Sequence, residues 1–149
     1  MKALYSITAH VKNGHAKTND GLFSLDLALP QELGGQGGAP NPEHLFAVGF
    51  ASCFENALRL LAKKGKIPLS DVEVAATVRL YAIADQGYKF GVTLAVEFEE
   101  ILPEAAKMLI DAAGAFCAYS NAARGNVEVK VNIKINKPSE FRTSKFLYL

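Results

Sequence analysis

Residues 126–136 read NVEVKVNIKIN, and in this stretch apolar and polar side chains alternate without a break. Successive side chains of a β-strand point to opposite faces of the sheet, so strict alternation predicts a strand with one buried and one solvent-facing side. The same pattern recurs in VEVAATVRL (72–80), FGVTLAVEF (90–98) and FSLDLAL (23–29). A further strand is expected around ALYSITAHV, with a hairpin turn after it at Lys12-Asn13-Gly14.

Two other segments have the spacing of an amphipathic helix. The first begins at Asn41-Pro42-Glu43, where Asn41 suits the N-cap and Pro42 the first helical position, and its apolar residues recur as far as Leu61. The second is PEAAKMLIDAAGAFCAYSN, residues 103–121. Strands, a helix, two strands, a helix and a strand therefore follow one another, which predicts an α+β domain with antiparallel hairpins flanking the helices.

The composition limits the class of protein. The chain has 149 residues, with 16 basic and 15 acidic side chains spread along it, and this balance argues against nucleic acid as a partner. The longest apolar run, Leu45 to Phe54, is too short to span a bilayer, and the N-terminus lacks the apolar stretch of a signal peptide. We therefore expect one cytoplasmic domain over residues 1–149 that has no membrane partner. A C-terminal tail from about Lys137 is set apart, because strand periodicity ends at Pro138.

The chain has two cysteines, and each lies on the apolar stripe of its own predicted helix. They are Cys53 and Cys117, 64 residues apart. Both could be small buried core residues, since free cysteine is among the most buried residue types. If the two helices pack face to face, the pair could instead approach the Cβ separation of about 4 Å that a disulfide needs and act as a redox pair. We expect no metal site, because the chain has no CxxC motif and no histidine neighbours either cysteine.

Glu43 lies in the first turn of the first predicted helix. There it could simply complement the helix dipole. Ten residues separate it from Cys53, which is about 15 Å along a straight helix. For Glu43 to act on that thiol, the helix must kink near Gly49, a cation must bridge the gap, or Glu43 must serve the cysteine of a second subunit.

Three longer stretches resemble one known family. They are DGLFSLDLALPQELGGQGGAPNPE (20–43), NPEHLFAVGFASCFENAL (41–58) and CAYSNAARGNVEV (117–129). All three resemble the organic hydroperoxide resistance branch of the osmotically inducible protein family, and the similarity runs from about Tyr5 to Ile135.

The resemblance implies an intertwined homodimer whose two central helices are wrapped by antiparallel sheets, with active sites at the subunit interface. It also implies a thiol peroxidase that needs no cofactor. Cys53 matches the cysteine that attacks the O–O bond of an organic or lipid hydroperoxide, and Cys117 matches the cysteine that resolves the product as an intramolecular disulfide. A dithiol reductant, such as a lipoylated protein, is expected to regenerate the thiols. Glu43 matches a carboxylate that holds a catalytic arginine over the thiolate.

The chain departs from the family pattern at the position of that arginine. The matching turn, HVKNGHAKTNDG, has Lys12 there, and all four arginines lie elsewhere. Lysine keeps the charge but lacks the planar fork of arginine, so we expect Lys12 to act as a weaker substitute. Ala118 also stands where the family commonly has a proline. Three aromatic residues are candidates for the substrate pocket wall or, alternatively, for the core: Phe46, Phe50 and Phe54.

Two other functions remain open. The chain could belong to the broader osmotically inducible branch, with the same chemistry and a different peroxide preference. It could also be a non-enzymatic binder of apolar molecules that keeps the scaffold and lost its reactivity with the arginine. Relative rates on cumene hydroperoxide and hydrogen peroxide would distinguish the first alternative from an organic hydroperoxide reductase. Thiol pKa values would distinguish the second alternative from a peroxidase.

Overall fold

The computed structural model describes residues 1–138. Contacts between residues divide the chain into two compact units, Met1–Phe46 and Ala47–Leu149. A single domain over residues 1–149 stays a prediction. The apolar end of the predicted C-terminal tail, residues 139–149, lies outside the described residues.

The first unit contains a small antiparallel sheet in the order β1-β2-β3. The predicted hairpin turn is confirmed, because Lys12 pairs with His15 and the two residues between them, Asn13 and Gly14, have φ values of 52° and 79°. Both outer strands are shorter than predicted. One hydrogen bond continues the pairing beyond β3, since the N–H of Leu27 donates to the carbonyl of Gly14 at 2.8 Å. The bounds are β1 (Ala9–Lys12), β2 (His15–Thr18) and β3 (Ser24–Asp26), followed by the 3-10 helix η1 (Gln31–Leu33).

The long helix α1 (Pro42–Lys64) begins where the sequence predicts. Asn41 caps it, because its Oδ1 accepts a hydrogen bond of 3.0 Å from the backbone N–H of His44. By length and composition α1 could cross a membrane, a test that the core helix of a soluble protein also passes. In this chain its Phe50, Phe54 and Leu58 are fully buried.

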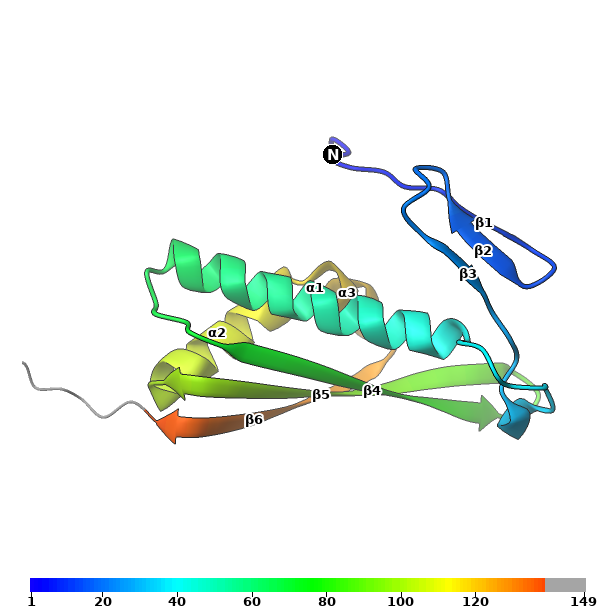
Figure 1. Ribbon diagram of the computed structural model, residues 1–149. Coiled ribbons are helices and arrows are strands. Elements are labelled where there is room, and N and C mark those ends of the chain that lie inside the picture. Colours follow the sequence, from blue (N-terminus) through cyan, green and yellow to red (C-terminus); the bar gives the residue numbers. More distant parts are fainter. Residues whose placement is uncertain (139–149) are drawn as a thin grey trace, which may run out of the picture. The chain divides into compact units, whose positions relative to one another are not determined.

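The second unit contains a three-stranded sheet in the order β4-β5-β6 (Figure 1). The antiparallel pairing that the sequence predicts is present between β4 and β5, but β6 runs parallel to β5. The prediction was wrong for this pair because two helices separate β5 from β6, and such a crossover returns the chain in its original direction. The elements are β4 (Val72–Ile83), β5 (Gly87–Ile101), α2 (Pro103–Phe116), α3 (Ala118–Ala123) and β6 (Glu128–Pro138).

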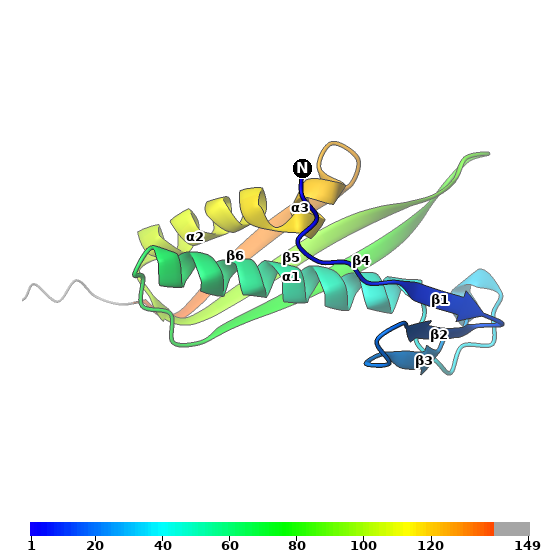
Figure 2. The same cartoon turned by 90° about the horizontal axis from the view of Figure 1, so that it is seen from above.

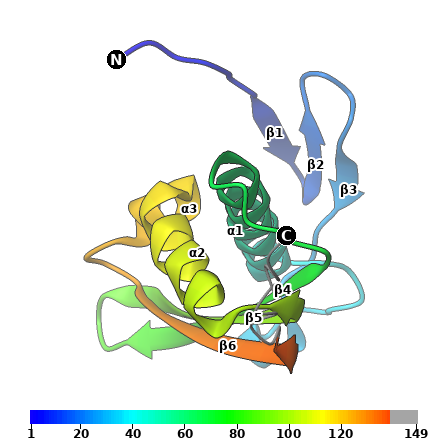
Figure 3. The same ribbon diagram turned by 90° about the vertical axis from the view of Figure 1, so that its left-hand side faces the viewer.

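The core of this unit lies between the sheet and the helices. Helices α1 and α2 lie side by side over one face of the sheet (Figures 2 and 3). The predicted alternation places one set of β5 side chains in this core: Val92, Leu94, Val96 and Phe98 are all buried. The α+β class is therefore confirmed.

One predicted helix is in fact two helices. The apolar spacing predicts a helix over residues 103–121, but α2 ends at Phe116 and α3 begins at Ala118. Between them Cys117 has an extended backbone, with φ −63° and ψ 126°. Apolar spacing did not reveal this break because residues 115–119 include neither glycine nor proline and the apolar stripe continues through it.

Candidate active site

The two cysteines lie together in the second unit. Their Sγ atoms are 2.9 Å apart, within hydrogen-bonding distance. Both are free thiols; Cys117 is buried and Cys53 is half-buried. An S–S bond is about 2.0 Å long, so once one sulfur has been oxidised the two need to approach by only about 1 Å to form a disulfide. This distance favours the redox-pair interpretation over two unrelated core residues.

Backbone hydrogen bonds on both sides fix the position of Cys117. Its N–H donates to the carbonyl of Ala113 at 2.8 Å, which closes the last turn of α2. Its own carbonyl accepts from the N–H of Asn121 at 3.0 Å, which opens α3. The break between the helices therefore places the Cys117 side chain at a defined corner.

A close contact between α1 and α3 lies next to the sulfurs. The rings of Phe50 and Tyr119 are 5.7 Å apart between centroids. Gly49 permits this approach, because a Cβ at that position would overlap the Tyr119 hydroxyl. Gly49 was predicted only as a possible kink, whereas α1 continues as a helix through it.

The surroundings of Cys53 favour its neutral form. Burial is the largest influence that raises its pKa, and the hydrogen bond with Cys117 raises it further. Backbone hydrogen bonds from Tyr119 and Ala118 act in the opposite direction. Sequence reasoning missed these donors, because a backbone amide is the same in almost every residue.

The other two predicted catalytic residues lie in the first unit. Glu43 is half-buried in the first turn of α1, and the helical rise still separates it from Cys53 by about 15 Å along the axis. Lys12 ends β1, is exposed, and stands opposite His15 in the β1–β2 pairing. His15 was not predicted; its Nδ1 lies 2.6 Å from Oδ1 of Asp26. The roles of Glu43 and Lys12 stay predictions.

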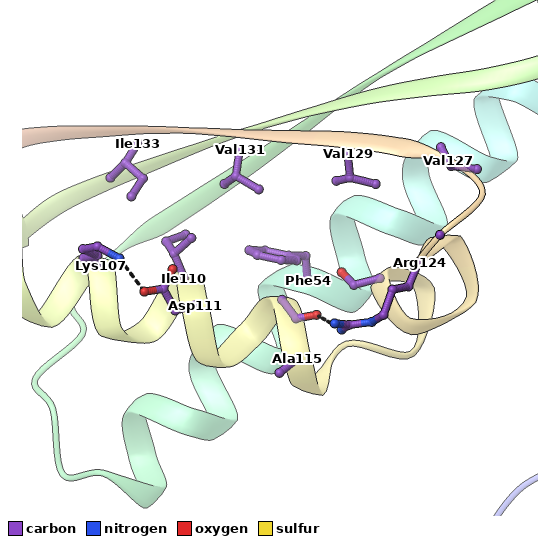
Figure 4. Close-up of a pocket in the computed structure, with 13 residues that line it drawn as sticks. Phe54, Lys107, Ile110, Asp111, Ala115, Arg124, Val127, Val129, Val131 and Ile133 are labelled. Atoms are coloured by element: carbon purple, nitrogen blue, oxygen red, sulfur yellow. Dashed lines mark hydrogen bonds and ion pairs between the residues drawn. The ribbon is translucent and has the colours of Figure 1, made fainter.

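The three phenylalanines differ in exposure. Phe50 and Phe54 are 0% and 1% exposed, whereas Phe46 is half-buried. Phe54 also lines a groove of about 710 Å³ between α2 and β6. Figure 4 shows apolar side chains of the β6 segment in a row along one wall, with Phe54 and Ile110 opposite them. The wall residues are Val127, Val129, Val131 and Ile133.

Metal ligands do not cluster within the described residues. Over residues 1–138, no three side chains of His, Cys, Asp or Glu are grouped so that they could hold a metal ion.

Comparison with known proteins identifies relatives over most of the chain. The family model described as OsmC-like protein matches residues 35–132. The organic hydroperoxide resistance protein OhrB of Bacillus subtilis is 43% identical over 123 residues, which cover 81% of this chain and 89% of that protein.

Two solved structures are also similar. An organic hydroperoxide resistance protein OsmC from Legionella pneumophila has 48% identity and a TM-score of 0.84, over 89% of this chain and 99% of the other. An organic hydroperoxide resistance protein from Elizabethkingia anophelis has 38% identity and a TM-score of 0.87, over 91% and 100% of the two chains.

Proposed function

Because the chain belongs to the OsmC-like protein family, we propose that it is a thiol peroxidase that reduces organic hydroperoxides to alcohols. The names of its relatives support a peroxide-related role, and organic hydroperoxides are the class of substrate that those names give.

The observation that carries the proposal is the distance of 2.9 Å between the two sulfurs. Two cysteines 64 residues apart meet at the break between two helices, although nothing local in the chain brings them together. A sulfenic acid formed on Cys53 would therefore have a thiol beside it, and it could condense to a disulfide before it is oxidised further.

The reaction has two steps. The thiolate of Cys53 attacks one oxygen of the O–O bond, that bond breaks, and the other oxygen leaves with its alkyl group and takes up a proton to give the alcohol. Cys53 is now a sulfenic acid. The sulfur of Cys117 then attacks the Cys53 sulfur, an S–S bond forms, and the hydroxyl leaves as water with the thiol proton. A dithiol reductant returns both sulfurs to thiols by disulfide exchange.

The first step needs a thiolate, and this requirement defines the roles of Lys12 and Glu43. Since burial raises the pKa of Cys53, a cation is needed beside it. Lys12 is proposed as that cation, and Glu43 as the carboxylate that orients it. Lysine offers a point charge without the fork of arginine, so activation by Lys12 is expected to be weaker.

We also propose that the working form is a homodimer in the cytoplasm, with no nucleic acid or membrane partner. The most apolar 18-residue window of α1 is only 28% buried in the single chain. A second copy that packs against this helix would cover more of its apolar surface. The proposed reductant is a dithiol, such as a lipoylated protein.

The first test is a count of thiols after exposure to peroxide. The reduced protein is treated with one equivalent of cumene hydroperoxide, and free thiols are counted by mass spectrometry, with Cys53→Ser and Cys117→Ser as controls. Rapid loss of both thiols, together with a linked Cys53–Cys117 peptide, is the expected result. Two intact thiols after long exposure would overturn the proposal.

A second candidate function is the binding of apolar ligands without chemistry. The groove between α2 and β6 favours it, because aliphatic side chains form one wall and the volume of about 710 Å³ would admit a small lipid. Ligand binding that is independent of peroxide, with a thiol that stays protonated at neutral pH, would support it. A peroxidase that prefers hydrogen peroxide to cumene hydroperoxide would instead indicate the broader branch of the family.

A further inference from the structure

The break between α2 and α3 at Cys117 removes the helical hydrogen-bond partners of two backbone amides, those of Ala118 and Tyr119. In a continuous α-helix each N–H donates to the carbonyl four residues earlier. If α2 continued, the amide of Ala118 would donate to Gly114, and the amide of Tyr119 to Ala115. The extended backbone of Cys117 ends the helix, so these two pairs do not form.

Two side chains, one from α3 and one from its C-cap, donate hydrogen bonds to the carbonyls of Gly114 and Ala115, which would otherwise accept from those two amides. Asn121 Nδ2 donates to the Ala115 carbonyl at 3.1 Å, and Arg124 Nη2 donates to the Gly114 carbonyl at 3.1 Å. The two side chains are also joined, because Arg124 Nη2 donates to Asn121 Oδ1 at 3.0 Å. Figure 4 shows the Arg124 guanidinium extending back to the end of α2. The two carbonyls therefore have donors without the Ala118 and Tyr119 amides.

The start of α3 lies at Cys53, because the sulfur of Cys117, the residue before Ala118, is 2.9 Å from the Cys53 sulfur. Backbone hydrogen bonds from Tyr119 and Ala118 lower the pKa of Cys53, against the effect of burial. The packing of Tyr119 on Phe50, one helical turn before Cys53, holds this end of α3 against α1. A backbone N–H stabilises the charged form of the group that accepts from it, so these donors favour the thiolate.

We propose that Asn121 and Arg124 are positioning residues that keep the two α3 amides directed at the Cys53 sulfur. This inference rests on the proposed function and deepens it, because the ionised sulfur is the one that attacks the peroxide. The purely structural alternative is that the two side chains only brace the corner. In that case their loss lowers stability but leaves the ionisation of Cys53 unchanged.

The most direct test removes one of the two N–H donors. Proline at position 118 has no N–H; its φ suits the first residue of a helix, and the extended backbone of Cys117 suits the residue before a proline. In a Cys117→Ser background, where Cys53 is the only thiol, the alkylation rate by iodoacetamide is measured against pH. Ala118→Pro is expected to lower the rate at pH 7 about tenfold, the change that one pKa unit produces. Ala118→Ser keeps the amide and is the matched control.

The same assay tests the two positioning residues. Asn121→Ala and Arg124→Ala should each move the alkylation profile to higher pH, because an uncapped α2 carbonyl competes for the released amide. Asn121 is uncharged, so its effect cannot come from a lost charge, and Arg124→Lys, which keeps a donor, should restore part of the rate. Arg79→Ala is the control, since that arginine bonds Thr93 on the sheet. Variants that melt at lower temperature but keep the alkylation profile of the control would overturn the proposal.

A measurement that leaves Ala118, Asn121 and Arg124 unchanged guards against misfolding of the variants at those positions. In Cys117→Ser protein, the amide proton resonances of Ala118 and Tyr119 should titrate with Cys53 in NMR spectra, and resonances that do not respond would contradict the inference. Neither assay uses a peroxide. A shifted profile in a protein that leaves cumene hydroperoxide intact would therefore reject the peroxidase and retain the positioning role.

Discussion

At the scale of single residues, the proposed reaction depends on how Cys53 ionises in an apolar place. Burial is the largest influence that raises its pKa, and the neighbouring Cys117 adds to it. Two backbone amides oppose these influences but carry no net charge. The thiolate therefore needs a cation as well, and Lys12 is the residue that we propose for that role.

A substitution series at Lys12 tests this role. Lys12→Ala should slow the consumption of cumene hydroperoxide at pH 7 by about tenfold or more, because an adjacent opposite charge commonly lowers a pKa by one to three units. Lys12→Arg should be at least as fast as the natural protein, since the fork can hold a carboxylate and a thiolate together. The rates are measured in stopped flow, with Lys17→Ala, an exposed lysine of β2, as control. The assignment is wrong if Lys12→Ala matches that control.

The raised pKa of Cys53 also predicts how stability depends on pH. At pH values between the ordinary cysteine pKa of 9.0 and the higher pKa of Cys53 in the folded protein, the folded protein holds a proton that the unfolded chain has released. The free energy of unfolding therefore falls as pH rises through this interval, and the effect is absent at lower pH. Thermal melts from pH 7 to 10.5 of reduced Lys12→Ala protein, which lacks the proposed cation, should show a steeper loss above about pH 9 than those of protein with both Lys12→Ala and Cys53→Ser. Parallel curves for the two proteins would show that the folded state does not raise this pKa.

At the scale of elements, the packing of α1 against α3 depends on a glycine. A Cβ on Gly49 would overlap the end of the Tyr119 side chain and displace that ring from Phe50. Gly49→Ala should lower the free energy of unfolding by about 1–3 kcal/mol, as overpacking commonly does, and slow disulfide formation.

A second glycine supplies the matched control for that substitution. Gly114 lies inside α2, and a Cβ there would meet nothing within 4 Å. Gly114→Ala should therefore stabilise the protein by about 0.5–1 kcal/mol. Urea unfolding of both variants measures the two changes. The packing argument fails if Gly49→Ala is as stable as Gly114→Ala.

The elements also show what the sequence could and could not predict. Alternation identified β4, β5 and β6, and the Asn41 cap identified the start of α1, because each signal lies within a few residues. The break at Cys117 was missed because neither glycine nor proline marks it, and because the sequence does not show that the side chains of Asn121 and Arg124 donate to the last carbonyls of α2. The sequence left two interpretations of the cysteines open, a redox pair and two separate core residues. Helical spacing predicts which side of a helix is apolar, but it does not predict which other element packs against that side.

At the scale of the whole molecule, the residues of the proposed site are divided between two parts of the chain. Lys12 and Glu43 lie in the first unit, and the cysteines lie in the second. Within α1, Glu43 and Cys53 are about 15 Å apart along the axis, too far for direct contact. Glu43 is therefore more simply placed if it serves the Cys53 of a second subunit, as an active site at a subunit interface would require.

Mixed dimers test this arrangement. Differently tagged Glu43→Gln and Cys53→Ser chains are co-expressed, and the dimer that carries both tags is purified. If Glu43 acts across the interface, one of the two sites combines Cys53 of the first chain with Glu43 of the second. The mixed dimer should then have about half of the natural peroxidase activity, matching a dimer of natural and Cys53→Ser chains. If Glu43 acts within its own chain, the only Cys53 in the mixed dimer lies in the chain that carries Glu43→Gln, so no site is complete. The activity per Cys53 thiol should then not exceed that of the Glu43→Gln homodimer. That second outcome would place both residues in one subunit. A bridging cation would then have to span the distance of about 15 Å along α1 between Glu43 and Cys53.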